Sequence, residues 1–193
     1  MSQSAPSATR RPADQVLRRT LIALGVLALV LALAVRLNAP TSRSQRLVGH
    51  TAPVFALPAE ANGARLPSVV RLPLQSDHPL LLVFTYSLCP QCLSKTLAAH
   101  DLQVREAGRG LDALYIDSPA ETPGIADAYF QRLGITAPIL LDSNGSVAAR
   151  YGIGYYPAIV LIDAHGIVRY VATGDTNTHA LATALDALLS LKG

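Results

Sequence analysis

The sequence of 193 residues contains no tryptophan, one methionine and only two cysteines. A structural zinc ion needs four ligands, and the five histidines are scattered without metal-ligand spacing, so zinc binding would require two chains to share a site. The net charge of +3 is confined to the first 19 residues, because residues 20–193 carry twelve cations and twelve anions. No basic stripe with interleaved aromatic residues remains, and a nucleic-acid partner is not expected. These absences direct attention to the two cysteines.

Charge is also missing from a run of fifteen apolar residues at positions 21–35. Extended to residues 20–37, the run predicts a membrane-targeting helix. About twenty residues span a typical bilayer, so the run is short for an anchor and long for a signal peptide. Ala32 and Ala34 form a pattern that a signal peptidase could cleave. We favour an uncleaved transmembrane anchor, with cleavage as the alternative.

The arginines before this run predict its orientation, because basic residues beside a membrane segment tend to stay in the cytoplasm. Residues 1–19 are then a basic cytoplasmic tail, and residues 38–46 form a polar linker. Residues 47–193 form one domain outside the cytoplasm. Half of the residues in the chain are apolar, which is enough for a single substantial core.

The two cysteines lie in a Cys-x-x-Cys motif that directly follows an apolar run at residues 80–84. A run without alternation predicts a strand covered on both faces. Pro90 suits the first position of a helix, where its missing N–H is not needed. Cys89 would then cap that helix, whose free N–H groups and dipole favour a thiolate. With Cys92 shielded one turn later, the pair has the form that thiol-disulfide exchange requires, an attacking and a resolving sulfur.

Two other uses of the motif fit the sequence poorly. A purely structural disulfide would close a very short loop and would therefore add little chain entropy to stability. Covalent haem attachment needs a histidine directly after the second cysteine, and residue 93 is leucine.

The remaining pattern predicts an α/β fold with a mixed central sheet and helices on both faces. Prolines near the first two strands suggest edge positions for both. Strands are expected at 54–57, 65–74, 80–84, 111–116, 139–141, 158–162 and 167–172, and helices from Pro90 to about Gly108 and at 123–133, 147–151 and 176–191.

Three stretches in the same order as in a known family carry a resemblance. They are VGHTAPVFAL at residues 48–57, the Cys-x-x-Cys motif, and residues 142–174, which include Tyr156-Pro157 and LIDAHGIVRYVATG. The chain resembles the thioredoxin-like fold and, within it, the membrane-tethered thiol-disulfide oxidoreductases of the TlpA and ResA type, in the AhpC/TSA and Redoxin superfamily. The resemblance covers about residues 47–191.

The resemblance implies roles for particular residues. The bond before Pro157 would be cis and face the two sulfurs, so that the backbone of Tyr156 can pair with a bound substrate chain. No cofactor is implied beyond a redox-active Cys89–Cys92 disulfide. The implied activity is reduction of exported protein disulfides, such as those of apocytochrome c. A membrane thiol-electron transporter would restore the dithiol, in a single-pass protein of the bacterial inner membrane with a periplasmic domain.

Two positions depart from the resemblance. Leu88 stands where most relatives have an aromatic residue, so surface selectivity is expected to differ. Val83 stands where thioredoxin has a buried aspartate, and the sequence shows no obvious proton acceptor for Cys92.

Three rival functions stay open. An oxidase or isomerase would share the fold, and Pro90-Gln91 is more similar to such oxidants than to thioredoxin. A peroxiredoxin-like peroxidase is suggested by Thr85, although that residue lies four positions before Cys89 rather than three. A copper-binding chaperone could use both thiolates as soft ligands, but relatives that deliver copper have a longer Cys-x-x-x-Cys spacing.

Overall fold

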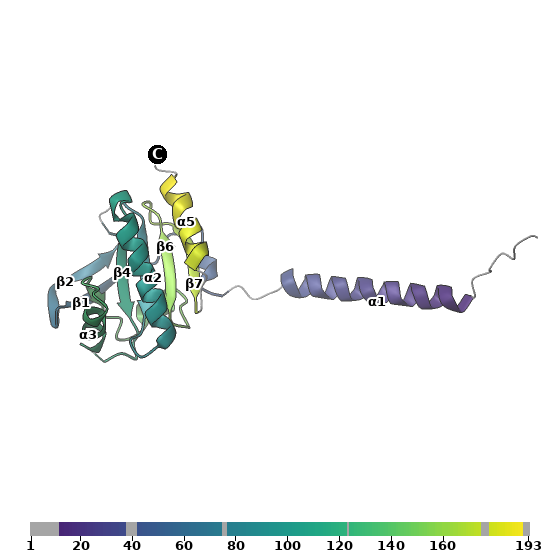
Figure 1. The fold of residues 1–193 in the computed structure, drawn as a ribbon, viewed down its shortest axis with the longest axis horizontal. Helices are drawn as coiled ribbons and strands as arrows, with labels where there is room; N and C mark the ends of the chain where they lie inside the picture. The colour runs from purple at the N-terminus through teal and green to yellow at the C-terminus, as the bar shows by residue number, and fades with distance from the viewer. Residues whose placement is uncertain (1–11, 38–41, 75–76, 123, 175–177, 191–193) are drawn as a thin grey trace, which may run out of the picture. The chain divides into compact units, whose positions relative to one another are not determined.

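The computed structural model describes residues 12–37, 42–74, 77–122, 124–174 and 178–190. The chain divides into two units, one up to Thr41 and one from Ser42 onward. The first unit contains helix α1 (Pro12–Leu37), and the second contains all the other elements (Figure 1).

Helix α1 includes the predicted membrane segment, and its large apolar side chains between residues 21 and 31 are exposed. Among the residues described, no helix is both long and apolar enough to cross a membrane. The anchor expected at residues 20–37 stays a prediction. Residues 1–11 of the expected tail and 38–41 of the expected linker lie outside the described residues.

The second unit is built on a seven-stranded sheet in the order β2-β1-β5-β4-β3-β6-β7. Strands β3, β4 and β5 run parallel and the other neighbours are antiparallel, so the sheet is mixed, as predicted. Every strand and helix expected in the domain has a counterpart. The strands are β1 (Phe55–Ala61), β2 (Ala64–Leu72), β3 (Leu80–Thr85), β4 (Asp112–Asp117), β5 (Ile139–Leu140), β6 (Ala158–Ile162) and β7 (Val168–Thr173).

The helices cover both faces of the sheet and enclose two hydrophobic clusters. Helices α2 (Pro90–Glu106), α3 (Ile125–Arg132) and α5 (Thr178–Ser190) pack on one face, and α4 (Ser146–Arg150) packs on the other. Strand β3 lies between β4 and β6, and all six of its residues are buried. Leu81 and Val83 face the cluster beneath α2, α3 and α5, whereas Leu82 and Phe84 face the cluster beneath α4. The uniformly apolar run before the motif is therefore explained by a strand with two buried faces.

The expectation that both early strands are edges is half correct. Strand β2 is an edge strand, but β1 pairs with β2 on one side and β5 on the other. The pairing register shifts between Pro58 and Glu60, and the Pro58 carbonyl accepts a hydrogen bond from the Leu141 N–H at 2.8 Å. The carbonyl and the missing N–H of Pro58 point to the same side, toward Leu141 just beyond the end of β5, so β1 can carry this proline in the interior where the β1–β5 pairing stops.

A hairpin turn between β1 and β2 was not predicted. Asn62 and Gly63 both have positive φ, at 53° and 76°, and Ala61 pairs directly with Ala64. An Asn-Gly pair of this kind suits the two-residue turns that match strand twist. The Asn62-Gly63 pair is a hairpin signal that can be read from the sequence.

The compact unit begins earlier than the expected boundary at residue 47. Ser44 is fully buried, and a 3₁₀ turn follows at Gln45–Leu47. The Gln45 side-chain Nε2 donates to the Val171 carbonyl of edge strand β7 at 2.8 Å. The last five residues of the expected linker therefore form part of the domain.

Candidate active site

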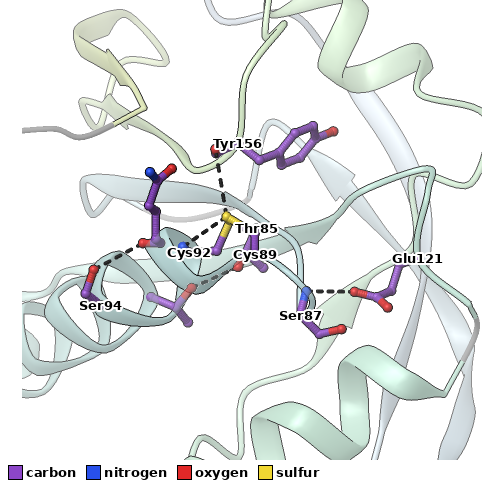
Figure 2. The surroundings of a disulfide bond; sticks show 9 residues. Thr85, Ser87, Cys89, Cys92, Ser94, Glu121 and Tyr156 are labelled. Atoms are coloured by element: carbon purple, nitrogen blue, oxygen red, sulfur yellow. Dashed lines mark hydrogen bonds between the residues drawn. A yellow bond between two sulfur atoms is a disulfide. The ribbon is translucent and has the colours of Figure 1, made fainter.

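Cys89 lies at the N-cap of α2, immediately before Pro90. Its backbone is extended, with φ −101° and ψ 110°, and its Sγ accepts a hydrogen bond from the Cys92 N–H at 3.1 Å (Figure 2). Pro90 has no N–H to compete for that position. A sulfur held by a backbone donor at the positive end of a helix is stabilised as a thiolate once the disulfide is reduced.

The two cysteines form a disulfide with a Cα–Cα distance of 5.2 Å. Cys92 is 0% exposed, whereas Cys89 is partly exposed. An incoming thiolate or disulfide can therefore reach only the Cys89 sulfur. This difference in access agrees with the prediction that Cys89 attacks and Cys92 resolves.

The Tyr156–Pro157 bond is cis, the isomer that the resemblance implies. It brings the Tyr156 carbonyl oxygen to 4.0 Å from Cys89 Sγ, while the Tyr156 ring turns away from the sulfurs (Figure 2). Burial raises the pKa of the Tyr156 hydroxyl to about 12, and the Asp142 carboxylate adds to this effect. The backbone of Tyr156, rather than its ring, is therefore the part next to the reactive sulfur.

Exposed apolar side chains lie beside Cys89 and beside Tyr156. Leu88, next to Cys89, is 70% exposed, and Tyr155, next to Tyr156, is 78% exposed. Leu93 adds a third exposed apolar side chain on the first turn of α2. Exposed apolar groups beside a reactive sulfur suit contact with a protein substrate better than with a small polar one.

The Thr85 hydroxyl forms a buried hydrogen bond. It is buried at the end of β3, where its Oγ1 lies 2.9 Å from Oγ1 of Thr96, one turn after Cys92 on α2. The hydroxyl that suggested a peroxidase is therefore engaged inside the domain and does not line an open site.

Sequence reasoning missed two acidic residues beside the motif. Asp117 ends β4, is 4% exposed, and has no partner for its Oδ1 within the described part of the chain. Burial, and secondarily the charge of Glu121, raise its pKa to about 8. Glu121 accepts a hydrogen bond from the Ser87 N–H at 2.7 Å, two residues before Cys89. Neither residue belongs to a recognisable motif, so only their position in space reveals them.

A cavity of about 240 Å³ lies at the other end of the sheet, lined by Leu80, Ile162 and Asp163 among others. Because Leu80 begins the strand whose far end leads to Cys89, this cavity is separate from the disulfide. Within the described ranges, no group of three or more His, Cys, Asp or Glu side chains is placed to hold a metal ion.

The fold and the paired cysteines define a protein of the thioredoxin-like class with a redox-active disulfide. The family model described as Redoxin matches residues 47–188, nearly the whole second unit. The chain belongs to the Redoxin family.

Individual relatives agree with this assignment. The thiol-disulfide oxidoreductase ResA of Geobacillus thermodenitrificans is 26% identical over 175 residues, which cover 91% of this chain and 97% of the relative. The thiol:disulfide interchange protein DsbE of Vibrio cholerae is 29% identical over 140 residues, 72% of each chain. A crystal structure from Chlorobium tepidum, provisionally described as a DsbE, has a TM-score of 0.64 and 23% identity over 74% of this chain and 97% of that one, and shows the shared fold. The expected enzyme class, a thiol-disulfide oxidoreductase, is confirmed, and these relatives are consistent with the expected TlpA and ResA type.

Proposed function

We propose that this protein reduces disulfide bonds of exported proteins from the outer side of the bacterial inner membrane. The observation that supports this most is the unequal access to the disulfide, with a reachable Cys89 sulfur at a helix start and a sealed Cys92 behind it. The exposed Leu88 and Tyr155 give a protein chain apolar surface to contact on either side of the sulfur.

The reaction consumes the reduced form of the site. The Cys89 thiolate attacks one sulfur of the substrate disulfide, so a mixed disulfide forms and one substrate thiolate leaves. Cys92 then loses its proton and attacks Cys89 Sγ, which expels the second substrate sulfur. Two electrons pass to the substrate, the two leaving sulfurs take up protons, and the Cys89–Cys92 disulfide is formed.

The backbone near Pro157 has a positioning role in this scheme. An extended substrate segment would pair with the main chain of Tyr156, whose carbonyl already lies 4.0 Å from the attacking sulfur. A backbone contact of this kind holds the substrate sulfur in line without selecting a side chain. We assign the selection of substrates to the exposed side chains of Leu88, Leu93 and Tyr155 instead.

A dithiol that is oxidised at every turnover needs a reductant. We propose a membrane thiol-electron transporter as that partner and a single-pass anchor at residues 20–37. The exposed apolar side chains of α1 support the anchor, because burying them in a bilayer would remove them from water. A suitable substrate in this compartment is apocytochrome c, whose cysteines must be reduced before haem attachment.

The decisive experiment traps the substrate. In Cys92→Ala, the mixed disulfide cannot be resolved, so membranes from cells that express it should contain adducts that dithiothreitol releases. Cys89→Ala should give none, because it lacks the attacking sulfur. Adducts on exported proteins with paired cysteines, including apocytochromes, support the proposal. Equal labelling in both variants, or adducts confined to cytoplasmic proteins, would contradict it.

The direction of electron flow is tested by the reduction potential. A reductase is expected near about −270 mV and a strong oxidant near about −120 mV. A value close to the second, together with net oxidation of a reduced peptide, would favour the oxidase alternative. Rapid peroxide turnover would favour the peroxidase, and stoichiometric copper retained through purification would favour the chaperone.

Location has its own test. A reporter enzyme fused after Gly193 should be active only outside the cytoplasm. Activity inside would contradict both the orientation and the reductant proposed here.

A further inference from the structure

The segment after β4 reaches across to the loop that precedes Cys89. Glu121 Oε2 accepts a hydrogen bond from the Ser87 N–H at 2.7 Å, and Figure 2 shows this carboxylate beside the loop. Glu121 itself is fixed by its own N–H, which donates to the Ser118 carbonyl at 2.9 Å. A charge-assisted hydrogen bond therefore links the backbone of the active-site loop to a different part of the fold.

Asp117 begins the same segment and lies at the base of the loop. In the parallel pairing of β3 and β4 it sits opposite Thr85, the residue from which the loop departs. It is nine-tenths or more buried, and its Oδ1 has no partner in the described structure. A hydrogen bond from the Ser118 N–H favours the ionised form of Asp117, but burial outweighs it.

The groups that face Asp117 come from four parts of the fold. Glu121 follows it in the chain, Glu60 comes from β1, Asp142 follows β5, and the Tyr156 hydroxyl comes from the loop before β6. Each of the three carboxylates opposes ionisation of Asp117. Of the three carboxylates, Glu121 raises the pKa of Asp117 most, and it is also the one that accepts a hydrogen bond from the loop.

We propose that Glu121 is a positioning residue for Cys89, and that a proton held on Asp117 allows the Glu121 carboxylate to keep its hydrogen bond to Ser87. When Asp117 ionises, repulsion between the two carboxylates weakens that bond and loosens the loop. The proposal deepens the function above by naming what sets the geometry of the attacking sulfur. It is consistent with the raised pKa of Asp117, about 8, whose main cause is burial.

Two substitutions separate contact from charge at residue 121. Glu121→Gln keeps an acceptor oxygen at the same reach but removes the charge. Glu121→Asp keeps the charge but shortens the side chain by one methylene and withdraws it from Ser87. If Glu121 acts only through its charge, the aspartate variant should behave like the parent protein.

The first measurement is amide hydrogen exchange at Ser87, in the full chain purified in detergent. Glu121→Asp should lower the protection of this amide by about tenfold, roughly the contribution of a hydrogen bond to a charged group. Glu121→Gln should retain most of the protection. In the parent, protection corrected for intrinsic exchange should fall as the pH rises through about 8, and in Asp117→Asn this fall should be absent.

The second measurement follows the Cys89 thiol through its rate of alkylation by iodoacetamide against pH, in a Cys92→Ala background. Glu121→Gln should lower the pKa of Cys89, because a nearby negative charge is gone. Glu121→Asp should raise that pKa relative to the parent, because the loop no longer holds the sulfur at the helix start. Glu106→Gln, which removes a carboxylate from the far end of α2, should leave the profile unchanged.

Failure of the proposal would be clear from these data. It is overturned if Glu121→Asp keeps full protection of Ser87, or if protection is lost while the Cys89 profile stays that of the parent. A fall in protection above pH 8 that persists in Asp117→Asn would overturn the role of Asp117. None of these readouts needs a substrate, so they stand apart from the test of the proposed function.

Discussion

Two buried aspartates at opposite ends of the sheet have their pKa values shifted in opposite directions. Asp117 ends β4 near the disulfide, and burial followed by the charge of Glu121 raises its pKa to about 8. Asp163 follows β6 at the other end, where burial also raises the pKa, but hydrogen bonds from the Ile167 N–H, Arg169 and the His165 N–H outweigh it and lower the pKa overall.

The comparison shows that burial alone does not decide the charge of a carboxyl group. Two backbone N–H donors and the Arg169 cation stabilise the ionised form of Asp163 and fix the β6–β7 turn. At Asp117 burial raises the pKa and the neighbouring negative charges add to this effect, so the neutral form is favoured. One end of the domain therefore favours a charged aspartate, and the other favours a neutral one at the position paired with Thr85, where the active-site loop begins.

The largest effect is expected from Asp163→Ala. Removal of this carboxylate leaves two backbone N–H groups and Arg169 without their acceptor, and we expect the free energy of unfolding at pH 7 to fall by about 3 kcal/mol. Urea unfolding would measure it. Disulfide exchange by the folded variant should match that of the parent, and slower exchange would show that the two ends are coupled.

Asp117→Asn should have the opposite sign. Because the folded pKa of Asp117 is raised, the folded chain holds a proton between pH 3.8 and about 8 that the unfolded chain releases, so stability falls as the pH rises through this window. We expect the variant to be more stable by about 2 kcal/mol at pH 8 and unchanged near pH 4. An equal change at both pH values would contradict the proton-holding role.

The stability contribution of Asp163 should depend on pH in the reverse way. Its lowered pKa means that the contribution is present above the ordinary aspartate value and is lost as the pH falls through the folded value. The difference in stability between the parent and Asp163→Ala should therefore shrink in acid, whereas the gain from Asp117→Asn grows toward pH 8. Unfolding curves between pH 3 and 9 test both slopes.

A smaller effect should come from Thr96→Val at the active-site end. It leaves the buried Thr85 hydroxyl without its partner at 2.9 Å, which should cost about 1 kcal/mol. Thr183→Val on α5 is a matched control, since that hydroxyl bonds to the His179 carbonyl at the surface. Comparable losses in the two variants would show that the Thr85–Thr96 bond adds nothing.

The smallest effect is expected from Arg169→Gln. The Arg169 side chain is about half exposed although its Nε lies 2.7 Å from Asp163, and exposed ion pairs contribute roughly 0.5 kcal/mol. A loss much larger than that, measured by thermal unfolding, would mean that the cation rather than the backbone donors stabilises the Asp163 carboxylate.

Much of the fold was predictable because its signals are local. The unalternating run at residues 80–84 indicated a strand buried on both faces, and that strand is central in the sheet. Errors occurred where a pairing partner decides the outcome. Pro58 suggested an edge, but it lies where the β1–β5 pairing stops, so β1 stays in the interior.

In the active site, too, the local features were predictable and the contacts between distant segments were not. Cys89, Pro90 and Cys92 lie within four residues, so one helix start was enough to predict their geometry. The Glu121 contact to Ser87 joins residues 34 positions apart, and no local pattern indicates it. Position 83 on the strand itself is valine, and the buried acidic residue at this end of the sheet is Asp117, on the neighbouring strand at the position paired with Thr85.

The sequence by itself determined the chemistry of the reactive pair, because the spacing of two cysteines around a helix start is a property of the local chain. Tertiary structure alone decided which carboxyl groups surround the active-site loop. The electrostatic environment of that loop depends on what distant segments place nearby, and only the packed sheet brings those segments together.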